Sequence, residues 1–294
     1  LSCRAGAARR DVMRKTLGMR LLLGYNALFA WRRRREGADG WISGSWDDEN
    51  TAVAYGRWRH DETPKFLRRF PPIDFAGKTV VDFGCSHGGS CVYYAEQGAA
   101  KVIGVDIGER QLQLARHYLK TADPDQRLPI DIRLGTHTRA PIDDASVDLL
   151  LCADVFEHVL DPVQVLSEWQ RVLKPGGRAL LSFGPPWLHP HGVHLWELFP
   201  APWTHLLFAE RTVVATRHFL KQDDLDPNVC THYRDLGFNQ MTIGRFLRLL
   251  RNSRLRVEKL ELCPVKNLKP LVWLPLLREF FVTEVHCVLQ RERA

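Results

Sequence analysis

Short apolar runs alternate with amphipathic stretches through the middle of the chain. Five runs rich in apolar and β-branched residues predict buried strands at 79–83, 101–105, 130–134, 147–152 and 178–183. Between them, the apolar side chains of residues 89–97, 109–120 and 162–173 recur at the three- and four-residue spacing of a helix. Strands that alternate with single helices predict a doubly wound, mostly parallel α/β sheet.

Residues with special backbone preferences mark the ends of these elements. Asp161 followed by Pro162 predicts an N-cap with proline at the first helical position. Gly98 suits the left-handed position after a helix, and Thr242 suits the N-cap of a further helix. Residues 255–262 and 282–289 then predict two more strands, which brings the sheet to seven.

Two segments interrupt this rhythm. Residues 185–241 are rich in proline, histidine and aromatic residues and are too long for a connector, which predicts an inserted cap. Residues 37–77 contain Trp41, Trp46 and Trp58, which suit either a lid over a ligand or packing for an N-terminal helix. We therefore expect four parts: an arm and lid segment at 1–77, a core at 78–184, the cap at 185–241, and the C-terminal part of the sheet at 242–294.

The charge of +7 belongs to the N-terminal arm. Residues 1–36 hold ten Arg and Lys against Asp11 and Glu36, so the rest of the chain is close to neutral. Six apolar residues share one helical face there, namely Leu17, Leu21, Leu22, Tyr25, Leu28 and Phe29. A helix on an anionic membrane surface through residues 17–35, a targeting peptide, and a helix packed on the protein body all fit this pattern.

The seven cysteines are scattered and form no C-x-x-C pair, so we expect reduced thiols in the core. No apolar run reaches the ~18 residues that a membrane span requires. Together with the near-neutral body, this favours a cytoplasmic protein, in which any membrane contact would be peripheral.

Residues 78–106 carry the first candidate chemistry. Glycines at 84, 88 and 89 follow the first strand and open a helix, so backbone N–H groups can approach an anionic ligand group. Asp106 ends the next strand, at the sheet edge where ligands bind in open α/β folds. The unit is predicted to bind a nucleotide. The pattern Gly84-x-Ser86-x-x-Gly89 is also close to the glycine motif that binds nicotinamide dinucleotides, but Asp82 inside the strand is less typical of that motif.

Four spaced segments extend this interpretation to a family. They are VVDFGCSHGG at 80–89, VIGVDIG at 102–108, VDLLLCADVFEHVLDP at 147–162 and LKPGGRALLSF at 173–183. In order and spacing they resemble the class I S-adenosylmethionine-dependent methyltransferases, specifically the type 11 group. The resemblance covers residues 78–184 and implies a Rossmann-like methyltransferase fold, S-adenosylmethionine as cofactor, and S-adenosylhomocysteine as product.

The resemblance also implies roles for individual residues. Asp82 and the backbone from Gly84 through Ser86 to Gly88 would hold the methionine end of the cofactor. Asp106 would bind the ribose and Ile107 would lie against the adenine, near Thr136. Ala153 and Asp154 would line the pocket beside the sulfonium. Ser86 replaces the usual glycine of the turn, and Gly135-Thr136 stands where Gly-Asp is common, which leaves the adenine contacts open.

Methyl transfer requires alignment above all, and a base only where the acceptor must lose a proton. His158, just past the fourth strand, suits either a general base or the cofactor pocket lining. In the cap, His189, His191 and His194 suit a metal site, an acceptor contact or a structural role. We expect no metal, and His194 is the residue we favour as a second base.

Together these observations predict an enzyme that methylates a small-molecule or lipid-linked acceptor, preferably at oxygen. An enzyme that acts on RNA or on a membrane-resident acceptor through the basic arm remains an alternative. A non-catalytic binding protein with this fold is the other. Nucleic acid is the less favoured partner because the basic charge is confined to the arm.

Overall fold

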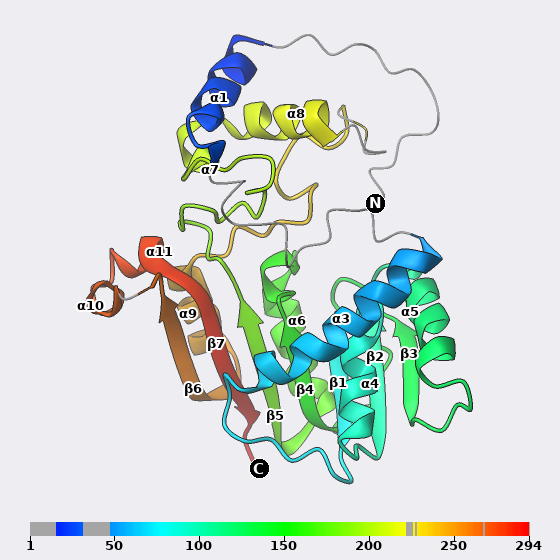
Figure 1. Ribbon diagram of the computed structural model, residues 1–294. Coiled ribbons are helices and arrows are strands. Elements are labelled where there is room, and N and C mark those ends of the chain that lie inside the picture. Colours follow the sequence, from blue (N-terminus) through cyan, green and yellow to red (C-terminus); the bar gives the residue numbers. More distant parts are fainter. Residues whose placement is uncertain (1–15, 32–47, 222–225, 227, 267, 294) are drawn as a thin grey trace. The chain divides into compact units, whose positions relative to one another are not determined.

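A computed structural model describes residues 16–31, 48–221, 226, 228–266 and 268–293 (Figure 1). Within these residues, seven strands form one sheet in the order β3-β2-β1-β4-β5-β7-β6. The strands are β1 (Thr79–Phe83), β2 (Lys101–Asp106), β3 (Ile130–Leu134), β4 (Val147–Ala153), β5 (Leu173–Phe183), β6 (Leu255–Pro264) and β7 (Val282–Arg291). The predicted α/β architecture is confirmed.

The sheet is parallel except where the last strand enters it. β1 pairs in parallel with β2 and β4, β2 with β3, and β4 with β5. β7 pairs antiparallel with β5. The connections through α4 (Gly89–Glu96), α5 (Glu109–Ala122) and α6 (Pro162–Val172) join parallel neighbours, and such crossovers are right-handed. Because the strand order reverses between β1 and β4, the carboxyl ends of these two strands form the topological switch point at which open α/β sheets bind ligands.

The capping signals in the sequence act as expected. The Asp161 carboxylate accepts a hydrogen bond from the backbone N–H of Gln164, and Pro162 begins α6. Thr242 caps α9 (Ile243–Asn252) by accepting from Arg245 N, and Gly98 has φ of 88°. One boundary differs from the prediction. β5 begins at Leu173 rather than at 178, because Leu173 already pairs with Val147 and the intervening residues form a bulge before Arg178 pairs with Leu149.

The chain divides into two compact units. One contains residues 43–183, 247–262 and 285–294, and we call it the core unit. The other contains residues 1–42, 184–246 and 263–284, and we call it the cap unit. The predicted start of the cap lies one residue from the division at Gly184. Of the predicted arm and lid segment, residues 48–77 group with the core, and the connection between β6 and β7 groups with the cap.

Within the core unit, α3 (Glu49–Leu67) crosses α4 and α5 through a contact that requires glycine. A Cβ at Gly89 would overlap the carbonyl oxygen of Gly56, and one at Gly56 would lie 2.6 Å from the Tyr118 ring. Thr63 and Ser90 join their hydroxyls across the same interface, 2.9 Å apart. The helix backbones therefore approach closely and hold α3 beside the turn that follows β1.

Within the cap unit, α1 (Leu17–Ala27) packs against α8 (Glu210–Lys221). Leu22 joins an apolar cluster with Val193, Phe199, Val213, Val214 and Tyr233. The buried Asn26 side chain accepts from Ala201 N, and the Tyr25 hydroxyl donates to Pro202 O. Packing on the protein body thus accounts for one face of the predicted N-terminal helix. The basic clusters at 4–15 and 32–35 and the tryptophans at 41 and 46 lie outside the described residues.

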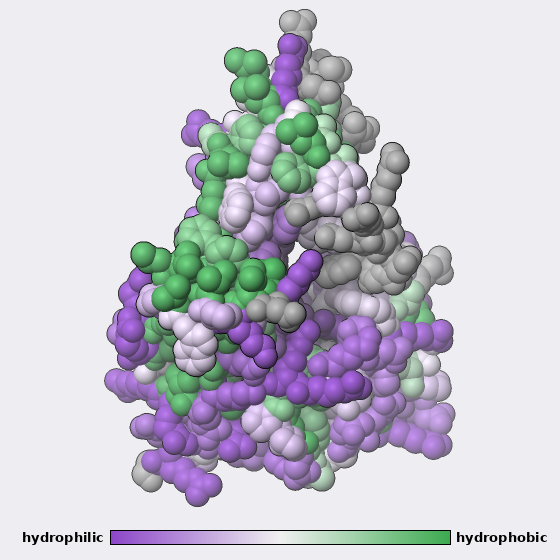
Figure 2. All heavy atoms as spheres, turned by 60° about the vertical axis from the view of Figure 1, so that its left-hand side comes forward, coloured by the Kyte–Doolittle hydropathy of each residue, from purple (hydrophilic) through white to green (hydrophobic). Residues whose placement is uncertain are grey.

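Other apolar side chains of the cap unit remain exposed. On α1 they include Leu17 and Leu21. A second group lies on the β6–β7 connection, around the short helices α10 (Lys269–Val272) and α11 (Arg278–Phe281). Figure 2 shows apolar surface on the face that lies to the left in Figure 1, where α10 and α11 are found. Among the described residues, no helix combines the length and apolar character needed to cross a bilayer.

The glycine contact makes a first prediction. Gly89→Ala should lower the free energy of unfolding by about 1–3 kcal/mol, because the methyl group meets backbone that cannot rotate away. Thermal and urea denaturation would measure the change. Gly24→Ala in α1, where a Cβ meets nothing within 4 Å, is the control and should be neutral or stabilising. Equal stability of Gly89→Ala and the wild type would contradict this packing.

Candidate active site

The turn after β1 has a backbone that favours glycine. Gly84 and Gly88 have φ of 83° and 78°, and Ser86 has φ of 47°. Ser86 therefore occupies the left-handed region in which glycine is usual, and its hydroxyl lies 2.8 Å from His87 Nδ1. A Cβ at Gly84 would lie 2.5 Å from the Val155 side chain. The turn therefore favours small residues, and at Gly84 a side chain would also clash with Val155.

Asp106 fixes the turn to the end of β2. One carboxylate oxygen accepts from Ser86 N and the other from Gly108 N, both at 2.9 Å. Each oxygen keeps a second lone pair, which is available to ribose hydroxyls. The clamp thus brings two residues predicted for the cofactor, Ser86 and Asp106, into direct contact.

The two predicted adenine contacts differ in their surroundings. Ile107 follows Asp106 and leaves 53% of its surface exposed, which offers an apolar face to a ring. The Thr136 hydroxyl instead donates to Arg139 O and accepts from Arg139 N. Because this hydroxyl is engaged within its own turn, it is poorly placed to bind adenine in place of the aspartate that is common at this position.

Asp82 lies inside β1 and is almost fully buried. The Cys91 thiol donates to its carboxylate at 3.4 Å. Burial raises the pKa of the Asp82 carboxyl to about 6, against the opposing effect of the Arg59 guanidinium. The carboxyl therefore titrates near neutral pH, and a cationic ligand group beside it would favour its ionised form.

Arg59, on α3, is a candidate that the sequence analysis missed. Its guanidinium donates to Ala153 O at 3.0 Å and lies 3.6 Å from the Asp154 carboxylate. The spacing of the buried residues Ala52, Gly56, Thr63 and Phe66 is the signal that could have identified this helix. Nothing local in the sequence indicates that Arg59 reaches the end of β4.

Ala153 and Asp154 lie at the carboxyl end of β4, beside the switch point. Asp154 has φ of 56°, and its carboxylate accepts from the Ser182 hydroxyl at 2.8 Å. Asp82, Arg59 and Asp154 thus bring two carboxyls and one guanidinium to neighbouring strand ends. This charge set complements an amino-acid group, which carries one ammonium and one carboxylate.

His158 lies on the 3-10 turn η1 (Phe156–His158) that follows β4. Phe156 anchors this turn by packing on Trp169 and Phe183 in the core. Glu157 is buried, whereas His158 is exposed. The geometry holds the His158 backbone firmly and leaves the imidazole accessible from the carboxyl edge of the sheet.

The predicted histidine cluster belongs to the cap unit and is bound largely to its own backbone. His189 Nδ1 accepts from His191 N, and His205 Nε2 donates to Trp187 O. His194 Nε2 donates to Pro185 O at 3.0 Å. Burial lowers the pKa of His189 and of His205 to about 4 in each case. The two buried imidazoles are therefore neutral and structural, while His194, which is half-buried, stays the candidate from this segment.

None of the described cysteines forms a disulfide. Cys85 and Cys91 are buried beside Asp82, and the pKa of each thiol is raised. Thiolate is the reactive form of cysteine. The surroundings of Cys85 and Cys91 therefore disfavour the reactive thiolate form.

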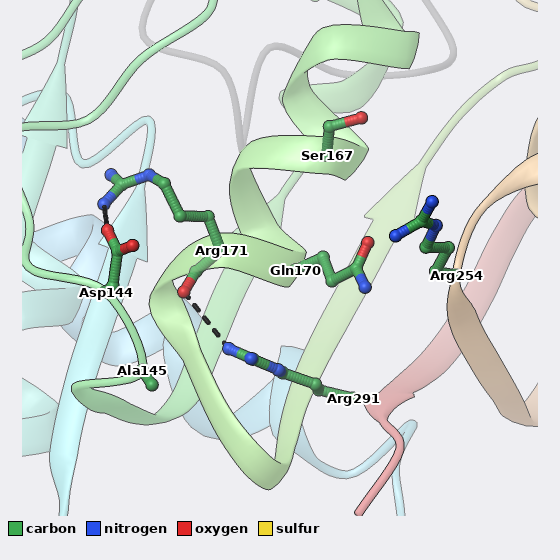
Figure 3. A pocket seen from close by; sticks show the side chains of 7 residues that line it. All are labelled: Asp144, Ala145, Ser167, Gln170, Arg171, Arg254 and Arg291. Carbon is green, nitrogen blue, oxygen red and sulfur yellow. Dashed lines mark hydrogen bonds and ion pairs between the residues drawn. The ribbon is translucent and has the colours of Figure 1, made fainter. Parts of the chain in front are cut away.

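A pocket of about 280 Å³ lies at the other end of the central strands, beside the residues that precede β4 and the C-terminal end of α6 (Figure 3). It is bordered by Asp144, Arg171, Arg254 and Arg291. Arg171 pairs with Asp144 and Glu168, and Arg291 donates to the carbonyl oxygens of residues 171 and 173 at the end of α6. A helix C-terminus disfavours anions. Two of the pocket's guanidinium groups are thus already paired within the protein, and the pocket lies away from the carboxyl ends of β1 and β4.

Part of the core unit matches a known protein family. Residues 81–181 match the family model described as "Methyltransferase domain". A Ubiquinone biosynthesis O-methyltransferase of Pseudomonas paraeruginosa is 32% identical over 142 residues, which are 45% of this chain and 59% of that protein. Its counterpart in Psychrobacter arcticus is 28% identical over 143 residues, 47% of this chain and 50% of that protein. The chain thus spans about three fifths or less of the length of these relatives.

Solved structures agree on the fold. An S-adenosylmethionine-dependent methyltransferase from Mesorhizobium loti aligns with a TM-score of 0.50 and 22% identity, over 78% of this chain and 97% of that one. A geranyl diphosphate methyltransferase in complex with S-adenosylmethionine aligns with a TM-score of 0.52 and 17% identity, over 86% and 94%. Residues 81–181 thus carry a methyltransferase domain of the type 11 group, and the strand order and the solved structures show that the core has the fold of the class I S-adenosylmethionine-dependent methyltransferases.

Proposed function

We propose that this protein transfers a methyl group from S-adenosylmethionine to an oxygen of a small-molecule or lipid-linked acceptor. The observation that carries the proposal is the meeting of the Asp106 clamp with the Arg59, Asp82 and Asp154 charge set at one switch point. The clamp suits a ribose and the charge set suits an amino-acid group. S-adenosylmethionine carries both, joined through a sulfonium.

Each part of the cofactor has a partner in this scheme. The Asp106 carboxylate accepts from the ribose hydroxyls, and the exposed face of Ile107 covers one side of the adenine. Arg59 binds the methionyl carboxylate, while Asp82 and Asp154 attract the ammonium and sulfonium charges. Gly84, Ser86 and Gly88 form the turn beside the methionyl chain, and their left-handed backbone favours residues with little or no side chain.

When bound, the cofactor supplies an electrophilic methyl group on sulfur. The protein's part is to hold an acceptor oxygen in line with the carbon–sulfur bond, since alignment is worth up to roughly 7–11 kcal/mol. A hydroxyl acceptor would give its proton to a base as the oxygen–carbon bond forms and the carbon–sulfur bond breaks, with S-adenosylhomocysteine as the leaving group. His158 at the end of β4 is the base in this proposal, and His194 of the cap unit is the second candidate.

Oxygen is favoured over nitrogen or carbon by one comparison. The relatives named above are O-methyltransferases by name, and that name specifies the atom that they methylate. That likeness covers less than half of this chain, and the cap segment lies outside the family match. The acceptor class therefore rests on the core domain, and its identity depends on residues 184–241.

Binding of three related ligands to two variants tests the cofactor assignment. Arg59→Gln should weaken S-adenosylmethionine and S-adenosylhomocysteine about tenfold or more, because a charge-assisted hydrogen bond is lost. It should leave methylthioadenosine unaffected, since that nucleoside lacks the carboxylate. Asp106→Ala should weaken all three ligands. Calorimetric titration would measure them.

Arg57→Gln, on the exposed side of the same helix, is the matched control. It should bind all three ligands like the wild type. If Arg59→Gln weakened methylthioadenosine as much as S-adenosylmethionine, Arg59 would act by positioning α3 and the carboxylate assignment would be wrong.

The raised pKa of Asp82 predicts a pH dependence. The cationic cofactor prefers the carboxylate, which is the minor form below a pKa of about 6. Affinity for S-adenosylmethionine should therefore rise about tenfold between roughly pH 5 and pH 7. Asp82→Asn removes the titrating group and should flatten the profile. An equally steep profile in this variant would exclude Asp82 as its source.

The base assignment is tested on turnover. In His158→Ala, methyl transfer from isotope-labelled S-adenosylmethionine to a hydroxyl acceptor should fall on the order of 10²–10⁴-fold, with unchanged cofactor affinity. His194→Ala reports on the second candidate in the same assay. Wild-type turnover in both variants would remove the proton-transfer role from these histidines.

A further inference from the structure

The β6–β7 connection of the cap unit exposes an unusual set of apolar side chains. Trp273 and Leu276 leave 84% and 83% of their surfaces in solvent, and Leu274 and Leu268 leave 52% and 40%. We call these four residues the β6–β7 apolar patch. Figure 2 shows apolar surface on this face of the molecule. Soluble proteins rarely expose large apolar side chains in contiguous groups unless the surface binds something.

The backbone of this connection explains why the side chains cannot turn inward. Pro270 lies in the first turn of α10, and Pro275 separates α10 from α11; each helix is a single turn. Neither helix has a buried residue. The Glu279 carboxylate accepts from Ile243 N and Gly244 N at the start of α9, which fixes the C-terminal end of the connection. The patch is held outward by anchored backbone.

Along the segment that carries the patch, the charged residues before Glu279 are all basic. From Val265 to Arg278 the sequence contains Lys266, Lys269 and Arg278 and no acidic residue. Lys266 and Lys269 are exposed. Basic side chains that flank exposed tryptophan and leucine match a bilayer surface, since anionic headgroups attract the cations and the headgroup boundary favours tryptophan.

We propose that the cap unit docks on an anionic lipid bilayer through the β6–β7 apolar patch. Trp273, Leu274 and Leu276 insert at the boundary between headgroups and acyl chains, and Lys266 and Lys269 bind lipid phosphates. A second copy of the chain is the less suitable occupant, because four residues fall well short of the roughly 20–30 that a standard protein interface uses on each side. The proposal is independent of the acceptor, and binding rather than activity tests it.

Vesicle co-sedimentation of the full chain tests this surface. Wild type should bind phosphatidylcholine vesicles that contain phosphatidylglycerol, and binding should weaken with added salt and in vesicles of phosphatidylcholine alone. Trp273→Asp and Leu276→Asp should each lower the partition coefficient about tenfold. A double change of Lys266 and Lys269 to Gln should reduce the preference for the anionic lipid.

Matched variants keep the test specific. Val163→Asp changes an exposed apolar residue on α6, in the core unit, and should bind vesicles like the wild type. Unchanged affinity for S-adenosylmethionine would show that each variant is folded. The proposal is overturned if wild type does not sediment with vesicles, or if Trp273→Asp and Leu276→Asp bind as wild type does. It is also overturned if Leu17→Asp and Leu21→Asp on α1 abolish binding while Trp273→Asp does not.

Self-association is measured in parallel. Suppose that the wild type forms a dimer that Trp273→Asp dissociates, and that the protein does not bind vesicles. This result would assign the patch to a second copy of the chain and refute the lipid proposal.

Discussion

The Asp106 carboxylate is the interaction on which the site depends. By accepting from Ser86 N and Gly108 N, it ties the turn after β1 to the end of β2 and stabilises a left-handed residue that is not glycine. Without this clamp, the turn would lose the partner that offsets the strain at Ser86. In the proposed function, this one side chain therefore sets both the position of the ribose and the shape of the turn beside the methionyl chain.

A second constraint is the glycine contact between α3 and α4. Because Gly56 and Gly89 carry no side chains, α3 lies close enough for Arg59 to reach the end of β4. The charge set thus draws Arg59 from α3, which precedes the sheet, and Asp82 and Asp154 from the ends of two parallel strands. Packing at the glycines and electrostatics at the strand ends are linked, since a shift of α3 would move the guanidinium.

The core was predictable because its signals are local. Apolar runs gave the strands, Asp161 and Pro162 gave the start of α6, and the glycines with Asp106 gave the turn after β1. Arg59 was not predictable, because its role arises from contact with Ala153, 94 positions away in the chain. The N-terminal helix showed the limit of periodicity. Its apolar face is shared between packing, through Leu22, and solvent, through Leu17 and Leu21. The cap histidines were similarly ambiguous, since only the fold reveals that His189 and His205 bind backbone groups.

The central claim is that the switch point between β1 and β4 binds S-adenosylmethionine. Calorimetric titration of the full wild-type chain with S-adenosylmethionine tests it most directly. We predict saturable binding at one site per chain, with S-adenosylhomocysteine as a competitor and NAD without effect. If S-adenosylmethionine did not bind, or if NAD displaced it, the assignment of this cofactor to the switch point would be wrong.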